Sequence, residues 1–161
     1  MINRAAELVL QLGLVAHPEG GYFGELYRSD TTVNPVDGRG VRPALTTIYF
    51  LLPAGAVSRW HRVRSDEVWH FYEGAPLDLW MAPPAGDRAD RYHLGRLGGG
   101  QRPVHTVPAG WWQAARSAGA YTLVGCTVGP GFDFSDFTLA ADVPSAAAGL
   151  RAGNPELASL L

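Results

Sequence analysis

The feature that most constrains this chain is a histidine and a glutamate on two neighbouring predicted strands, inside the pattern Gly55-x5-His61-x-Val63-x3-Glu67-x6-Gly74. Gly55 lies in a turn at residues 53–56, which separates an apolar strand at 46–52 from a second strand at 57–63. Because side chains alternate along strands, a hairpin can bring His61 and Glu67 together inside a rolled sheet. An imidazole and a carboxylate that meet there can bind a divalent metal or carry out acid–base chemistry.

A second segment, residues 108–113, reads Pro-Ala-Gly-Trp-Trp-Gln. Together the two segments resemble the paired motifs of the cupin superfamily, Gly-x5-His-x-His-x3-4-Glu-x6-Gly and Gly-x5-Pro-x-Gly-x2-His-x3-Asn. Two of the four usual metal-ligand positions differ, since Val63 and Gln113 stand where histidines are expected, and Ser117 replaces the asparagine. Valine cannot coordinate, and an amide carbonyl is a poor ligand for metals that choose imidazole. The resemblance therefore supports a barrel more strongly than a metal site, which would rest on His61 and Glu67.

Further motifs make the chain similar to a small single-domain cupin family of undefined function, over about residues 5–140. They are His17-Pro18-Glu19-Gly20-Gly21-Tyr22-Phe23, Asp66-Glu67-Val68-Trp69-His70-Phe71-Tyr72, Val107-Pro108-Ala109-Gly110 and Leu123-Val124-Gly125-Cys126-Thr127-Val128-Gly129-Pro130-Gly131-Phe132. This resemblance implies an all-β fold, a double-stranded β-helix (jelly roll, or cupin barrel), with short N- and C-terminal helices. It also implies a homodimer, and a shape like that of the deoxysugar epimerases of the same superfamily. It supplies no known reaction.

The pattern of the chain agrees with one domain over residues 1–161, with the barrel at about 20–140. Strands are predicted at 21–28, 45–52, 57–63, 67–73, 77–82, 90–94, 102–107, 111–115, 121–128 and 137–139. A helix over residues 3–12 begins at the capping residue Asn3 and ends at Gly13, and a short last helix is predicted at 155–161. The Gly-, Pro- and Arg-rich segment 31–43 is predicted to form a loop over the barrel mouth.

Composition excludes several functions. The net charge of −2 argues against nucleic-acid binding, and the lack of a long apolar run argues against a membrane span. All thirteen basic residues are arginine, so Schiff-base catalysis through a lysine is excluded. Cys126 is the sole cysteine, which rules out an intrachain disulfide, and it is expected to be buried in a strand. With no secretory pattern at the start, the expected location is the cytoplasm.

Alternation assigns further candidates for the pocket. Arg59 should face the same way as His61, where it would hold a substrate carboxylate or phosphate or pair with Glu67. His70 should face away from Glu67 unless a bulge turns it inward as a third ligand or acid–base partner. Trp69 should share a face with Glu67, and Trp111 with Gln113, so both tryptophans are expected to wall the pocket. Tyr22 and Tyr49 are candidates for a ligand contact and a general acid.

Three functions remain open at this point. The first is a metal-independent isomerase, epimerase, lyase or cyclase that acts on a small polar metabolite, with His61 as base, Glu67 orienting it and a tyrosine as acid. The second is a metal-dependent enzyme in which His61, Glu67 and either His70 or Gln113 hold iron, manganese or zinc. The third is a non-catalytic binding or sensing module. The cofactor is correspondingly either a divalent metal ion or none.

Overall fold

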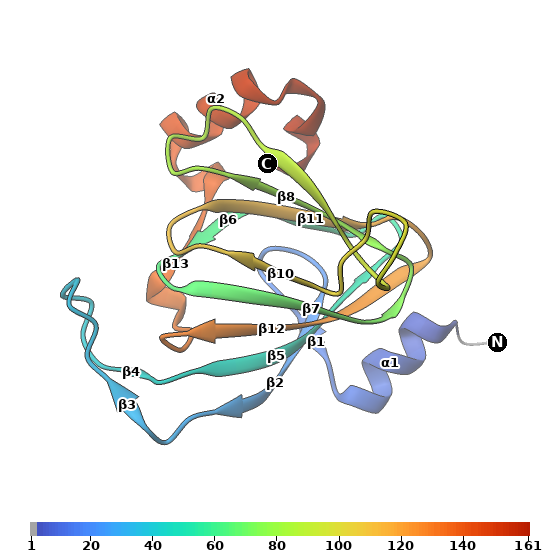
Figure 1. The fold of residues 1–161 in the computed structure, drawn as a ribbon, viewed down its shortest axis with the longest axis horizontal. Coiled ribbons are helices and arrows are strands. Elements are labelled where there is room, and N and C mark those ends of the chain that lie inside the picture. The colour runs from blue at the N-terminus through green and yellow to red at the C-terminus, as the bar shows by residue number, and fades with distance from the viewer. Residues whose placement is uncertain (1–2) are drawn as a thin grey trace.

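Two β-sheets face each other and enclose the main core (Figure 1). The computed structural model describes residues 3–161. The first sheet has the strand order β1 (Val15–Ala16), β2 (Tyr22–Arg28), β5 (Thr46–Pro53), β12 (Tyr121–Gly129), β7 (Asp66–Gly74) and β10 (Val104–Val107). The second has the order β13 (Phe137–Leu139), β6 (Val57–Val63), β11 (Trp112–Ser117), β8 (Leu77–Ala82) and β9 (Asp90–Leu94). The non-sequential strand order and the antiparallel pairing confirm the predicted jelly roll.

Both sheets are covered on their outer faces by helices, which explains why strands such as β8 are buried at every position. Helix α1 (Arg4–Leu12) places Ala5 and Leu8 against Leu51 of β5 and Leu123 of β12. Helix α2 (Pro144–Gly153) and the 3-10 segment η3 (Pro155–Leu160) pack on the second sheet. There they bury a tryptophan-rich cluster that includes Trp60, Trp80, Trp112, Leu150 and Leu157. A strand with apolar neighbours on both faces reads as a continuous apolar run rather than an alternating one.

Most elements match the sequence prediction. Strands 57–63, 77–82, 90–94 and 137–139 have the predicted bounds, and Asn3 caps α1 by accepting a hydrogen bond from the Ala6 amide. The C-terminal prediction is wrong in one respect, because helix α2 was not expected and residues 155–160 form a 3-10 segment. Helix α2 has an alanine-rich sequence with Pro144 in its first turn, which is a usual helix start.

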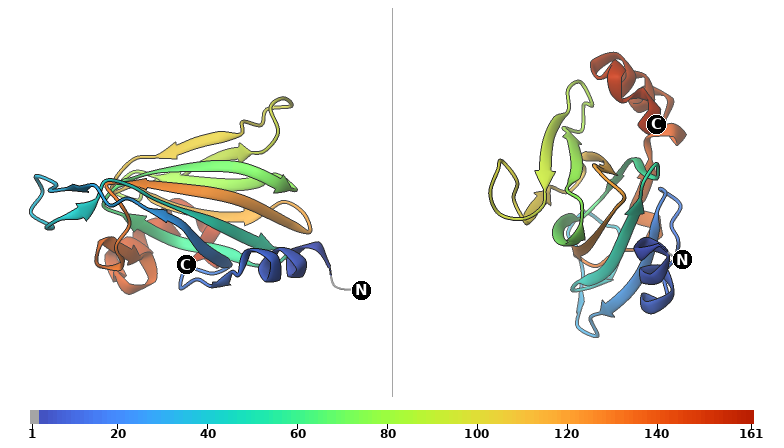
Figure 2. Two further views of the ribbon diagram at one scale, coloured as in Figure 1. Left: turned by 90° about the horizontal axis from the view of Figure 1, so that it is seen from below. Right: turned by 90° about the vertical axis from the view of Figure 1, so that its right-hand side faces the viewer.

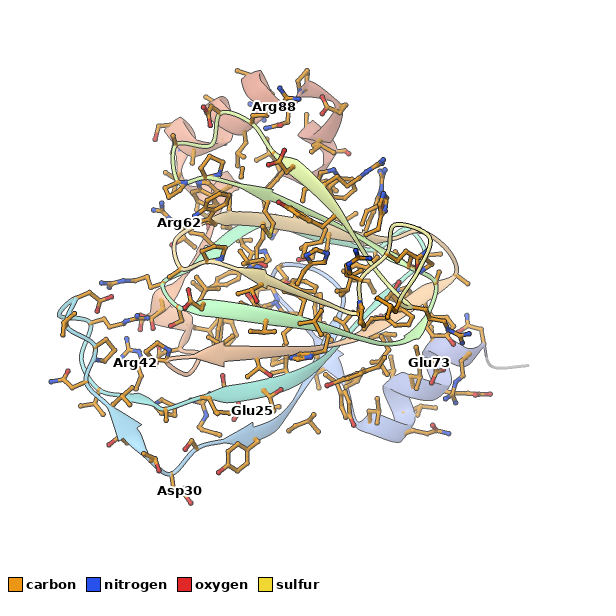
Figure 3. The ribbon with its side chains drawn as sticks, viewed as in Figure 1. Glu25, Asp30, Arg42, Arg62, Glu73 and Arg88 are labelled. Atoms are coloured by element: carbon orange, nitrogen blue, oxygen red, sulfur yellow. The ribbon has the colours of Figure 1, made fainter. Side chains whose placement is uncertain are left out.

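The predicted loop at residues 31–43 forms a small hairpin of β3 (Thr32–Val33) and β4 (Arg42–Pro43), and it projects beyond one end of the barrel (Figure 2). Arg42, at the base of the hairpin (Figure 3), donates from Nε and Nη2 to the buried carboxylate of Asp136, at 2.9 Å in both contacts. Arg39 adds a third contact to the same carboxylate at 3.3 Å. These ion pairs fasten the hairpin to the 3-10 turn η1 (Phe134–Asp136), which borders the pocket.

Within residues 3–161, no helix is both long and apolar enough to cross a bilayer.

Candidate functional site

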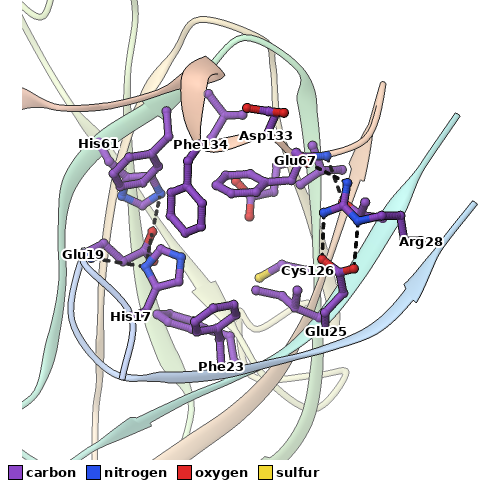
Figure 4. A pocket seen from close by; sticks show the side chains of 17 residues that line it. His17, Glu19, Phe23, Glu25, Arg28, His61, Glu67, Cys126, Asp133 and Phe134 are labelled. Atoms are coloured by element: carbon purple, nitrogen blue, oxygen red, sulfur yellow. Dashed lines mark hydrogen bonds and ion pairs between the residues drawn. The ribbon is translucent and has the colours of Figure 1, made fainter. Parts of the chain in front are cut away.

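A cavity of about 370 Å³ lies between the two sheets and contains the two residues singled out by the sequence motif (Figure 4). His61 comes from β6 and Glu67 from β7, and their side chains are 2% and 7% exposed. Side chains from β2, β5, β12, β13 and the turn after β12 complete the walls. The lining consists of His17, Glu19, Phe23, Glu25, Arg28, Thr46, Ile48, Phe50, His61, Val63, Glu67, Cys126, Val128, Phe132, Asp133, Phe134 and Phe137.

A bulge in β6 aims His61 into this cavity. In the register with β11, Gln113 opposes His61 and Ala115 opposes Ser58, so two residues of β6 face the single residue Ala114. The extra residue breaks the alternation, and Ser58 and His61 both reach the buried interior although they are three positions apart. Trp60 consequently points to the outer cluster under α2.

The hydrogen bonds of His61 determine which ring nitrogen carries its proton. Its Nδ1 lies 2.7 Å from the backbone carbonyl oxygen of Arg59. A carbonyl can only accept, so Nδ1 is the donor and a neutral ring has a bare Nε2. That Nε2 lies 3.2 Å from Oε2 of Glu19. Two acceptors at this distance require a proton between them, and Glu19 and His61 therefore share one.

Glu19 and its neighbour His17 were missed as site residues by the sequence reasoning, which used their segment only to establish the resemblance. The Glu19 carboxylate is buried, accepts a hydrogen bond from the Ser58 hydroxyl at 2.7 Å, and lies 3.5 Å from Nδ1 of His17. Gly20 makes this possible, since its φ of 115° suits glycine and a Cβ there would collide with the carbonyl of Val57. The sequence signal that could have identified them is the pair of ionisable residues His17 and Glu19 just before the Gly20-Gly21 turn.

Glu67 is held from behind by a chain of buried hydrogen bonds. The Trp69 indole Nε1 donates to Oε1 of Gln113 at 2.9 Å, and Nε2 of Gln113 donates to Oε2 of Glu67 at 2.6 Å. Since an indole N–H can only donate, it fixes the orientation of the Gln113 amide and so presents an N–H to the carboxylate. Cys126, which is buried, lines the same cavity as Glu67.

Burial shifts the protonation of every ionisable group on this pocket floor. Burial raises the pKa of Glu19, which His17 and the Ser58 hydroxyl partly oppose. Burial likewise raises the pKa of Glu67, with His61 and the Gln113 hydrogen bond acting in the opposite direction. Burial lowers the pKa of His61 and of His17, although the neighbouring carboxylates counteract this. Each group is thus pushed toward its neutral form, which brings carboxyl and imidazole pKa values closer together.

Of the other predicted site residues, none lines the cavity, and the predicted orientation of Arg59 needs correction. Arg59 is turned away by the bulge and donates to the Pro18 carbonyl at 3.0 Å. Ile48 and Phe50 of β5 face the cavity, and Tyr49 between them therefore faces α1. Predicted site residues that lie outside the lining are Tyr22, Tyr49, Arg59, His70, Trp69, Trp111 and Gln113.

The two predicted tryptophan walls are also wrong. Trp69 is buried in the core between the sheets and Trp111 packs against that core, and neither reaches the cavity. Gln113 and Trp69 still act on the site indirectly, through the hydrogen bonds to Glu67. His70 pairs with Gly125 across the first sheet and, as alternation predicted, does not join Glu67 in the lining.

The residues present do not fit a metal ion of the kind bound by metal-dependent cupins. Val63 offers no donor atom, and the Oε1 of Gln113 already accepts from Trp69. Among residues 3–161, no three histidine, cysteine, aspartate or glutamate side chains are grouped as a metal ion requires. Instead, His61 is paired with Glu19, and Glu67 accepts a hydrogen bond from Gln113.

Comparison with known families identifies the chain. Residues 6–140 match the family described as Cupin superfamily (DUF985). The chain belongs to this family. Two solved structures are similar over nearly the whole length. One is a hypothetical protein from Leishmania major, with 34% identity, coverage of 98% of this chain and 96% of that one, and a TM-score of 0.81. The other is a protein from Shewanella oneidensis, with 35% identity, coverage of 99% and 95%, and a TM-score of 0.81.

More distant structures share the cupin fold alone. Oxalate decarboxylase from Bacillus subtilis is 16% identical with a TM-score of 0.58, and the match covers 91% of this chain and 36% of the decarboxylase. No protein with a curated description matches the sequence. Family membership therefore establishes the fold and leaves the chemistry to be argued from the site.

Proposed function

We propose that this cupin binds a small metabolite in the barrel and catalyses proton transfer on it, as an isomerase, epimerase, lyase or cyclase does. The observation that carries the proposal is the convergence of two buried carboxyls and two buried imidazoles on one cavity. A buried charge costs free energy unless it is used or paired, and groups with pKa values displaced toward neutrality are suited to acid–base catalysis.

Glu67 is the proposed base. Gln113 orients its carboxylate, and the cavity gives it access to a bound molecule. In the first step Glu67 accepts a proton from a carbon of the substrate, and the electron pair of the broken C–H bond moves to a neighbouring carbonyl or imine. The proton shared by Glu19 and His61 is then given to the atom that has gained the electron pair. In the second step the protonated Glu67 gives its proton to a different carbon, or to the other face of the same carbon, and the Glu19–His61 pair takes its proton back. No proton is gained or lost over an isomerisation.

This assignment differs from the sequence-based hypothesis in both groups, since the base is Glu67 instead of His61 and the acid is not a tyrosine. A tyrosine was expected there, but the lining contains none. Glu19 takes that position, because it is the group that shares a proton with His61. The five phenylalanines of the lining supply an apolar wall, so the bound molecule has an apolar body as well as the polar group on which the chemistry occurs.

The test begins with a ligand screen by thermal shift and proceeds to NMR in D₂O with each ligand that binds. We expect the wild-type protein to exchange a carbon-bound proton of a ligand for deuterium. Glu67→Gln should slow this exchange by about 10²–10⁴-fold, the usual contribution of a general base, while the ligand still binds. Asp30→Asn, a change of an exposed carboxylate outside the pocket, should have no effect. Binding without any exchange would refute the catalytic proposal and favour a binding module.

A further inference from the structure

The charged side chains around the cavity restrict the ligand more narrowly than the reaction class does. Four carboxyl side chains line it, and they come from Glu19, Glu25, Glu67 and Asp133. A single arginine, Arg28, is the only permanently charged cation in that lining. We propose that the ligand is an organic amine, bound as a cation and carrying an apolar body. This proposal rests on the proposed function only in assuming that the same cavity is the binding site.

The charge of Arg28 is already balanced by a carboxylate of the same lining. Its Nε and Nη2 donate to the two oxygens of Glu25 at 2.9 and 2.8 Å, which is a bidentate pair. Its Nη1 donates to the backbone carbonyl of Phe132 at 3.2 Å. All three guanidinium nitrogens are therefore engaged on the pocket rim (Figure 4). Nη1 and Nη2 each keep one N–H, but Glu25 neutralises the guanidinium, so a ligand carboxylate or phosphate meets no net positive charge there.

The histidines do not replace this cation. Nδ1 of His17 accepts a hydrogen bond from the Glu19 amide at 3.2 Å, so this nitrogen is bare. Burial lowers the pKa of both His17 and His61 and keeps them neutral. A ligand phosphate in this cavity would thus meet carboxylates without a free cation to balance it, which disfavours its binding strongly.

Two carboxylates are placed to balance a cation instead. Glu67 reaches the cavity from the floor, and only one of its oxygens accepts the Gln113 amide. Asp133 lies at the rim, where the Ser135 amide and hydroxyl both donate to its Oδ1 at 2.8 and 2.6 Å. These hydrogen bonds lower the pKa of Asp133 and keep it ionised. An ammonium in the cavity would therefore have carboxyl partners both on the floor and at the rim.

The walls between these carboxylates are aromatic. Phe132 lies edge-on to Phe134, with ring centroids 5.0 Å apart, and Phe134 and Phe137 are 6.1 Å apart. Phe23 packs edge-on against His17 at 4.7 Å on the opposite side. Aromatic ring faces attract ammonium groups within about 6 Å of the ring centroid, and they also accept the apolar part of an amine. Acidic ends with aromatic walls thus match an organic cation and oppose an anion.

The experiment compares three probes of nearly equal size, 2-phenylethylamine, 2-phenylethanol and 3-phenylpropionate, by isothermal titration calorimetry at pH 7.5. We expect the amine to bind at least 10-fold more tightly than the alcohol, and the carboxylate to bind most weakly. The amine's advantage over the alcohol should shrink at least 3-fold in Asp133→Asn and in Glu67→Gln, and should persist in the surface control Asp30→Asn. Equal binding of amine and alcohol, a preference for the carboxylate, or no binding of any probe would overturn the proposal.

The outcome is independent of the catalytic test. Amine selectivity without deuterium exchange would support the ligand class and refute the proton-transfer function. Deuterium exchange on an anionic ligand would support the proton-transfer function and refute the proposed ligand class.

Discussion

Replacing Glu67 by glutamine should stabilise the free protein at alkaline pH, which is an unusual result for a buried, hydrogen-bonded residue. Glutamine has the same shape and can still accept the hydrogen bond that Gln113 donates at 2.6 Å. What the variant loses is a charge in a position only 7% exposed. The burial of one carboxylate costs several kcal/mol, and a single charge-assisted hydrogen bond returns about 1.5–3 kcal/mol. The net gain on neutralisation is about 1–2 kcal/mol.

The sign and pH range of this effect follow from the raised pKa of Glu67. Above its ordinary value of 4.5, the folded protein holds more protons on this carboxyl than the unfolded chain does. Wild-type stability therefore falls as the pH rises from 4.5 through the folded-state pKa, and the variant escapes this loss. Urea unfolding of both proteins at pH 4.5 and pH 8.5 measures the difference, which should be near zero at the lower pH and about 1–2 kcal/mol in favour of the variant at the higher pH. In a chain of this length the melting temperature rises by roughly 2–8 °C.

Glu73→Gln serves as the matched control. Glu73 accepts hydrogen bonds from Arg4 and Tyr121 at the surface, and these contacts lower its pKa. Its contribution is present above pH 4.5 and lost as the pH falls, so its removal should destabilise slightly at pH 8.5 and not at all at low pH. If Glu67→Gln is no more stable than the wild type at pH 8.5, the claim that Glu67 is a poorly compensated buried charge is wrong.

Three other variants test the frame around the site. The pair Val63→His with Gln113→His restores four ligand positions with His61 and Glu67, so the variant should retain Co²⁺ after dialysis and show a visible absorption band; a metal-free product would mean that these positions do not converge. Trp69→Phe leaves a buried amide oxygen of Gln113 without a donor and should cost about 1–3 kcal/mol in urea unfolding, and an unchanged midpoint would contradict the hydrogen-bond chain. Asp136→Ala removes the carboxylate that Arg42 and Arg39 share and should lower the urea midpoint, whereas an unchanged midpoint would show that the hairpin is held by other contacts.

The sequence predicts the barrel well because its strands are bounded by turns and glycines with clear signals. Gly55 adopts a positive φ of 79° in the turn before β6, as a glycine in that motif should. Apolar periodicity then places β6 and β8 at the observed residues. Helix α2 was missed because its alanines have little hydrophobic contrast, and it rests on the barrel mainly through Leu150.

The site is less predictable, for three physical reasons. A bulge cannot be read from residue types, and the one in β6 reverses the expected direction of Arg59. Long-range pairing is also invisible to local patterns. The partner of His61 was expected to be Glu67. It is Glu19, which is far from β6 in sequence and whose Oε2 lies 3.2 Å from Nε2 of His61. The face of β5 that points into the barrel was ambiguous as well. Because α1 covers the outer face of β5, apolar side chains lie on both faces, and Tyr49 could have faced either way. The homodimer implied by the resemblance stays a prediction.

The protonation of His61 is the most direct test of the account, since proton sharing with Glu19 depends on it. A long-range ¹H–¹⁵N correlation spectrum of the histidine side chains at pH 7 reports which nitrogen carries hydrogen. The His61 signals should be those of a neutral ring protonated at Nδ1, and they should stay so at a pH where an exposed histidine is already protonated, because burial lowers the pKa of His61. A neutral ring protonated at Nε2, or an imidazolium that titrates like an exposed histidine, would contradict the proposed proton-sharing pair.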